Sequence, residues 1–193
     1  MEDKLLFERT KRNILIKKDF QTDYNYGIEP EKRSIKELLD LGIVNLNKPS
    51  GPTSHQVTDY VKRIFELNKA GHSGTLDPNV TGVLPIAFGS GTRVVQTLLK
   101  AGKEYICLMH LHKDVSLEDI KKTALKFTGK IEQLPPIKSA VKRRLRTREI
   151  YYLNILEVED RSVLFKVGCE AGTYIRKLCF DFGKKLGTNA HMM

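Results

Sequence analysis

The sequence predicts a protein of mixed helices and strands, and three kinds of pattern support this prediction. Capping boxes, in which Ser or Thr precedes Glu or Gln by three residues, begin at Ser34 and Thr53 and indicate helix starts. The apolar run over 83–88 has the composition of a strand. Two further runs, over 150–158 and 162–169, flank a short polar turn as the strands of a hairpin do. These elements agree with an α+β fold, although they do not single it out.

The chain is expected to begin with an arm and to continue as one domain over residues 34–193. Residues 1–33 mix both charge signs with few periodic apolar positions, which predicts an extended arm that lies over the body or is partly disordered. After the arm the patterns predict, in chain order, a helix over 34–41, a strand over 42–46, a helix from Thr53, a strand over 83–88, a helix capped by Thr92, a strand over 103–112, a helix over 116–127, the hairpin, and a helix from Thr173 to Gly187.

The helix after Thr53 has an apolar stripe that we expect to pack inward. The side chains at helical spacing are Val57, Tyr60, Val61, Ile64 and Phe65.

Composition indicates an intracellular, soluble protein with a polyanionic partner. The 193 residues carry a net charge of +10, which supports a nucleic-acid partner but does not establish one. The three cysteines lie in apolar segments without paired spacing, so we expect buried thiols, a reducing compartment and no disulfide. No apolar stretch is long enough to span a bilayer and no signal-peptide core is present, so we expect no membrane association.

Residues 71–84, Gly-His-Ser-Gly-Thr-Leu-Asp-Pro-Asn-Val-Thr-Gly-Val-Leu, place one carboxylate, Asp77, in a loop just before a strand. The glycines permit backbone conformations that a Cβ would forbid, and Pro78 fixes φ directly after the acid. This pattern favours a carboxylate with a defined position. The alternative is a surface turn in which Asp77 bonds only its own backbone.

Two other patterns point to ligands that we do not expect. The turn over 89–93, Gly-Ser-Gly-Thr-Arg, opens a helix but lacks the lysine and spacing of a phosphate-binding loop, so we expect no nucleotide cofactor. Cys107, His110 and His112 suggest a metal. Strand alternation, however, puts Cys107 on the opposite face from the two histidines, and no fourth ligand is evident.

Two basic features favour an anionic partner. The segment over 138–148 is the densest positive run in the chain and suits a phosphate backbone; the alternative is a solvated charge run. Arg176 stands near a predicted helix start, where a positive charge opposes the helix dipole. That misfit favours a specific anionic partner for Arg176.

The segments over 47–55, 71–84 and 172–176 resemble, in the same order, the motifs of the tRNA T-loop pseudouridine synthase family. The likeness is greatest to its dyskerin branch of archaeal type, which works in guide-RNA particles, and it extends from about residue 25 onward. It implies an α+β fold with a mixed, mainly antiparallel central sheet, flanking helices and an active-site cleft along one side. Family members continue through a further strand and an RNA-binding PUA domain, so we expect residues 1–193 alone to have lower stability and little activity.

The resemblance also implies the catalytic roles. Asp77 is the catalytic carboxylate, Tyr105 is the aromatic platform on which the target base stacks, and Arg176 is the cation that keeps the carboxylate charged. His72 fills the space that the target nucleotide leaves, and Tyr174 completes the pocket wall.

Lys48, with Pro49, is assigned to the substrate site as support beneath the catalytic loop, although a lysine is ordinarily solvated. The basic segment leads into the family's RNA-gripping thumb loop. Its residues assigned to RNA binding are Lys142, Arg143, Arg144 and Arg146.

The implied function is the isomerisation of selected ribosomal RNA uridines to pseudouridine, in the cytoplasm, by the catalytic subunit of a box H/ACA ribonucleoprotein. The implied partners are guide RNA, target RNA and the particle's other proteins. The reaction is a rearrangement without redox change, so no cofactor or metal is expected. Two alternatives stay open: a guide-independent enzyme acting on the tRNA T loop, and a noncatalytic RNA-binding scaffold.

Overall fold

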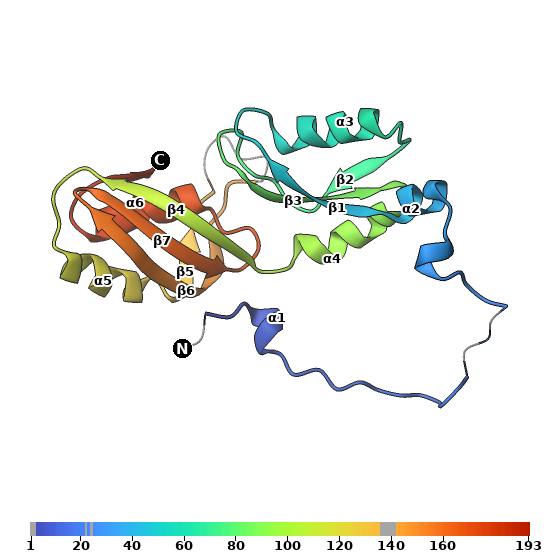
Figure 1. Ribbon diagram of the computed structural model, residues 1–193. Helices are drawn as coiled ribbons and strands as arrows, with labels where there is room; N and C mark the ends of the chain where they lie inside the picture. Colours follow the sequence, from blue (N-terminus) through green and yellow to red (C-terminus); the bar gives the residue numbers. More distant parts are fainter. Residues whose placement is uncertain (1–2, 22, 24, 136–141) are drawn as a thin grey trace. The chain divides into compact units, whose positions relative to one another are not determined.

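The computed structural model of the protein describes residues 3–21, 23, 25–135 and 142–193, and the chain divides into two units (Figure 1). The first unit is Asn13–Lys100. The second is Met1–Arg12 together with Ala101–Met193. Every strand pair in the described residues is antiparallel, and helices pack on both sheets. The α+β class and the mainly antiparallel pairing are therefore confirmed, with the strands in sheets of three and five. Residues 34–193, predicted as one domain, include parts of both units.

The Asn13–Lys100 unit is built on a sheet with strand order β1-β3-β2. Its core joins the buried side chains of Val57 and Val61, on a helix, to those of Leu84, Ile86 and Phe88 on the central strand. Its elements are η1 (Pro30–Lys32), α2 (Ile35–Leu41), β1 (Ile43–Lys48), α3 (Ser54–Ile64), β2 (Ala70–His72), β3 (Gly82–Phe88), η2 (Gly89–Val94) and α4 (Val95–Leu99).

Both predicted capping boxes form. The Ser34 and Thr53 side chains accept hydrogen bonds from backbone N–H groups three residues on, and Glu37 and Gln56 accept in return from the cap residues' N–H groups. Each box uses groups only three residues apart, so the local sequence is enough to specify it. The prediction for Thr92 is wrong. Thr92 lies within η2, where its hydroxyl donates to the Gly89 carbonyl, and α4 begins only after Val94.

The inward face of α3 is also different from the prediction. Val57 and Val61 are buried as expected, but Tyr60, Ile64 and Phe65 are 49%, 73% and 45% exposed. The other buried residues of α3 are polar, Ser54 and Thr58. The buried stripe is rotated because α3 packs on the loop before β3 as well as on the sheet, and it bonds that loop through Ser54.

The second unit is built on a sheet with strand order β5-β6-β7-β4-β8. The predicted hairpin is confirmed as β6 and β7, with Val158 opposite Val163 across the turn. The elements of this unit are α1 (Leu6–Arg9), β4 (Lys103–Leu111), α5 (Leu117–Lys126), β5 (Gly129–Gln133), β6 (Arg146–Glu159), β7 (Ser162–Cys169), α6 (Ile175–Lys185) and β8 (Ala190–Met192).

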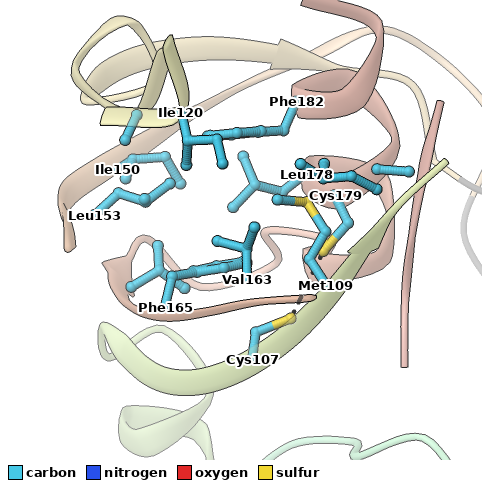
Figure 2. Close-up of a cluster of buried hydrophobic side chains, with 14 of the residues drawn as sticks. Cys107, Met109, Ile120, Ile150, Leu153, Val163, Phe165, Leu178, Cys179 and Phe182 are labelled. Carbon is cyan, nitrogen blue, oxygen red and sulfur yellow. Dashed lines mark hydrogen bonds between the residues drawn. The ribbon is translucent and has the colours of Figure 1, made fainter. Parts of the chain in front are cut away.

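One face of this sheet packs on α5 and α6 to form the larger core (Figure 2). Phe165 and Val163 of β7 and Met109 of β4 meet Leu178 and Phe182 of α6 there. All three cysteines are buried and free, and burial raises the pKa of the Cys169 thiol to about 11. The sulfurs of Cys107 and Cys179 lie 3.6 Å apart, a proximity that their sequence spacing does not indicate.

Asp3, near the start of the arm, contacts two side chains that are far from it in the sequence. The carboxylate of Asp3 accepts a hydrogen bond from Asn154 Nδ2 at 2.6 Å and lies 3.0 Å from Lys166 Nζ. The Asn154 bond and then Lys166 lower the pKa of Asp3. Residues 10–21 form no helix or strand, and the short helices α1 (Leu6–Arg9) and η1 (Pro30–Lys32) lie within the predicted arm. Among the described helices, none is long and apolar enough to cross a membrane.

Candidate active site

Asp77 lies in the connection between β2 and β3, two antiparallel strands in which His72 is opposite Ile86. Backbone hydrogen bonds form within the loop and between the loop and β3, the strand that follows it. Ser73 N–H donates to the Pro85 carbonyl, and Val80 N–H donates to the Asp77 carbonyl, both at 3.0 Å. The Asp77 side chain is partly buried. The loop is therefore a defined turn held on a strand pair.

Lys48, at the end of β1, holds this loop in place through hydrogen bonds to its backbone carbonyls. Its ammonium group is fully buried and donates to the carbonyls of Pro49 at 2.7 Å, Pro78 at 2.9 Å and Val80 at 3.0 Å. An ammonium group has three donors, so all are used. The N–H of Gly51 also donates to Pro78 O, at 2.9 Å. The geometry supports a positioning role for Lys48 and leaves it no donor for a substrate.

Ser54, in the first turn of α3, also holds the loop and was not predicted as a site residue. Its hydroxyl accepts from Leu76 N–H at 2.9 Å and donates to Leu76 O at 3.2 Å. Leu76 directly precedes Asp77. The sequence offered one usable signal, a serine on the inward stripe of an amphipathic helix, where an apolar residue is usual.

His72 is placed on β2, at the start of the loop that carries Asp77. Its ring is partly buried, and its Nδ1 atom is buried without a hydrogen-bond partner among the described residues. A buried polar atom of this kind calls for an explanation, because nearly all such atoms in native proteins have partners. A ligand that bonds His72 would supply one.

The remaining catalytic candidates lie in the second unit. Tyr105 is near the start of β4, opposite Val167, and packs against the edge of the larger core. Tyr174 is the N-cap residue of α6, and Arg176 is in the first turn of that helix. The first turn has no acidic side chain. Asp77 belongs to the other unit, Asn13–Lys100.

Gln133 anchors the start of α6 and was also missed. Its side chain is 2% exposed, and it pairs with the backbone of Tyr174 in both directions. Tyr174 N–H donates to Gln133 Oε1 at 3.0 Å, and Gln133 Nε2 donates to Tyr174 O at 3.2 Å. The chain direction at Tyr174 and Arg176 is therefore fixed by a residue of β5.

The basic segment leads into β6. Of its residues assigned to RNA, Lys142, Arg143 and Arg144 are exposed, while Arg146 is partly buried within the strand. Exposure suits phosphate contact but also suits a solvated charge run. The residues at 138–141, also part of the predicted segment, lie outside the described residues.

Metal-binding geometry does not occur in the described part of the chain, where no group of three or more His, Cys, Asp or Glu side chains is arranged to hold an ion. Cys107 points into the core. The ring of His112 contacts His191 of β8, with a distance of 2.9 Å between His112 Nε2 and His191 Nδ1.

Comparison with known families gives two matches. Residues 62–175 match the family described as "TruB family pseudouridylate synthase (N terminal domain)", and residues 3–58 match the "DKCLD (NUC011) domain". Curated relatives include a "Probable tRNA pseudouridine synthase B" of Methanopyrus kandleri, 56% identical over 98% of this chain and 56% of the relative. The protein of the same name from Thermococcus kodakarensis is 57% identical over 94% of this chain and 54% of its own.

Solved structures agree with these matches. A chain of a "Cbf5-Nop10-Gar1 Complex" is 55% identical, with a TM-score of 0.91 over 96% of this chain and 56% of that one. A chain of an "H/ACA RNP bound to a substrate RNA containing 2'-deoxyuridine" is 50% identical, with a TM-score of 0.89 over 98% of this chain and 57% of that one. The chain thus spans a little over half the length of the relatives that it matches.

Proposed function

The chain belongs to the TruB family of pseudouridylate synthases, and on that premise we propose that it carries the catalytic loop of an RNA pseudouridine synthase with Asp77 as the catalytic carboxylate. The main support is the loop itself. The residues on either side of Asp77 are hydrogen-bonded through their backbones to buried side chains from an earlier segment. Ser54 bonds the backbone of Leu76, and Lys48 bonds the carbonyl of Pro78. A surface turn with no function would not need this support.

The chemistry requires a fixed carboxylate at an extruded nucleotide. The reaction breaks the bond from ribose C1′ to uracil N1 and forms a bond from C1′ to C5, and the hydrogen on C5 is exchanged for one on N1. The uridine must first leave its stack, at a cost of about a few kcal/mol. The roles proposed for Tyr105 and Arg176, a stacking platform and a positive charge that favours an ionised carboxylate, rest on the family motifs. His72 and Tyr174 are proposed to complete the pocket.

We further propose that the reaction is guided by RNA within a box H/ACA particle in the cytoplasm. A chain of a solved H/ACA assembly is 50% identical to this one over 98% of its length. The proposed partners are guide RNA, target ribosomal RNA and proteins of the Nop10 and Gar1 kinds, with a kink-turn protein on the guide. The exposed residues Lys142, Arg143 and Arg144 are proposed to contact phosphates.

A second candidate is guide-independent modification of tRNA, which the names of the curated relatives favour. A noncatalytic RNA-binding scaffold is the third. It does not require the combination of Asp77, Tyr105 and Arg176, and this is the reason to place it last.

The test is release of tritium from RNA that carries 5-tritiated uridine, in the presence of guide RNA and partner proteins. We expect the Asp77→Asn variant to bind RNA and to release no tritium above background, because it lacks the ionised carboxylate. Asp59→Asn is the matched control, since Asp59 is a carboxylate on α3 that pairs with Arg63.

Each outcome favours one candidate. Release that needs both guide RNA and Asp77 supports the guided enzyme, and release from tRNA without a guide supports the second candidate. Undiminished release by Asp77→Asn, or no release with either RNA by a chain extended to the full length of its relatives, would contradict an enzyme that acts through Asp77.

A further inference from the structure

Ser54 has an unusual position for a serine. It is 1% exposed, on the stripe of α3 that packs inward, yet the neighbouring Thr53 already caps the helix by accepting from Gln56 N–H. The hydroxyl of Ser54 is therefore not needed to begin α3. Serine is also no better than average as a helix former. Helix formation does not explain this side chain.

The partner of Ser54 explains it. Both hydrogen-bonding functions of the hydroxyl are directed at Leu76, 22 positions further along the chain, with Leu76 N–H donating at 2.9 Å and Leu76 O accepting at 3.2 Å. Backbone N–H and C=O groups that are buried need partners. The single hydroxyl supplies both partners for the residue directly before Asp77.

The other side of Asp77 is held independently. The Pro78 carbonyl accepts from Lys48 Nζ at 2.9 Å and from Gly51 N–H at 2.9 Å. With Leu76 fixed by Ser54 and Pro78 fixed by Lys48, the backbone on both sides of Asp77 is restrained. The direction of the carboxylate follows from the backbone that carries it.

We infer that Ser54 is a positioning residue for the Asp77 carboxylate, acting through the backbone of Leu76. This inference rests on the proposed function. A misplacement of about 1 Å in a catalytic group costs on the order of 100-fold in rate. Loss of the hydroxyl thus affects the chemical step, while RNA binding, which involves other surfaces, is retained.

The test compares Ser54→Ala with Thr58→Val in the tritium-release assay. Thr58 is a matched control, because it is a buried hydroxyl on the same stripe that donates within the helix, to Ser54 O at 2.8 Å. We expect Ser54→Ala to lower kcat by about 10- to 100-fold, with KM for RNA within about twofold of the wild type, and Thr58→Val to change neither. Equal kcat values for the two variants would overturn the inference.

A second readout does not depend on activity. Amide hydrogen exchange at Leu76 and over residues 77–80 is expected to become faster in Ser54→Ala and to stay unchanged in Thr58→Val. Unchanged exchange in Ser54→Ala overturns the inference, whether or not the wild type releases tritium. Undiminished release by Asp77→Asn, by contrast, overturns the proposed function alone.

A milder variant covers the case in which Ser54→Ala does not fold. Ser54→Cys keeps a weaker donor and acceptor at the same place. We expect its kcat and its exchange rate at Leu76 to lie between those of the wild type and the expectation for alanine. Wild-type values for both would count against the inference.

Discussion

At the residue scale, three buried polar side chains act on the backbone of segments far from their own. Lys48 bonds the carbonyls that follow Asp77, Ser54 bonds the residue that precedes it, and Gln133 bonds the backbone before Arg176. A polar group that is buried without a partner costs free energy, so each pairing is specific. These residues fix where the candidate catalytic groups stand, although none of them is a candidate for the chemistry.

Lys48 gives the first prediction at this scale. We expect Lys48→Met to lower thermal stability, because three carbonyls lose their common donor and an unsatisfied buried group costs about 1–3 kcal/mol. The midpoint of unfolding, followed by circular dichroism, measures the change, and tritium release should fall with it. Lys69→Met, at an exposed lysine of the same unit, is the control. Equal midpoints for the two variants would show that the three bonds are not needed.

At the scale of elements, two helices, one in each unit, are held at their first turns by side-chain hydrogen bonds to other elements. α3 holds Ser54 in its first turn, and α6 holds Arg176 in its first turn after the N-cap residue Tyr174. Both helix starts are attached to other elements through side chains, α3 to the Asp77 loop and α6 to β5. Moving either attachment would therefore move a whole helix start and the residues on it.

Gln133 gives the prediction for elements. We expect Gln133→Met, which keeps the volume but removes both hydrogen bonds, to destabilise the second unit by about 1–3 kcal/mol and to reduce tritium release. Denaturant unfolding measures the first effect. Gln96→Met, at an exposed glutamine of α4, is the matched control. Wild-type stability in Gln133→Met would contradict the anchoring role assigned to this side chain.

At the scale of the whole molecule, charge is the dominant feature. A net charge of +10 over 193 residues favours association with any polyanion and gives no sequence selectivity. Selectivity must then come from elsewhere, and guide pairing is the source that we propose. The exposed residues Lys142, Arg143 and Arg144 concentrate positive charge just before β6.

Salt dependence tests that contribution. The logarithm of the RNA association constant should fall linearly with the logarithm of salt concentration, and Arg143→Ala should reduce the slope by about 1 if Arg143 neutralises one phosphate. Fluorescence anisotropy over about 50–200 mM salt is suitable. Arg63→Ala, at an exposed arginine paired with Asp59, provides the comparison. A slope unchanged by Arg143→Ala would support the solvated charge run instead.

The sequence by itself determined the features that depend on near neighbours. The capping boxes at Ser34 and Thr53 and the β6–β7 hairpin form as predicted, because their bonds join groups close together in the chain. The three motifs identified the family, and the family matches agree. The candidate residues Asp77, Tyr105 and Arg176 came from the family resemblance as well, and their catalytic roles stay predictions.

Only the tertiary structure decided which face of α3 is buried and which backbone groups the supporting side chains bond. Ser54 meets Leu76 across 22 positions, Lys48 meets Val80 across 32, and Gln133 meets Tyr174 across 41. The periodicity of apolar residues in the sequence does not reveal such pairs. Each partner is a backbone N–H or C=O group, and nearly every residue type offers the same two groups. Their specificity arises only when the fold buries a polar side chain against one stretch of backbone and excludes water from both.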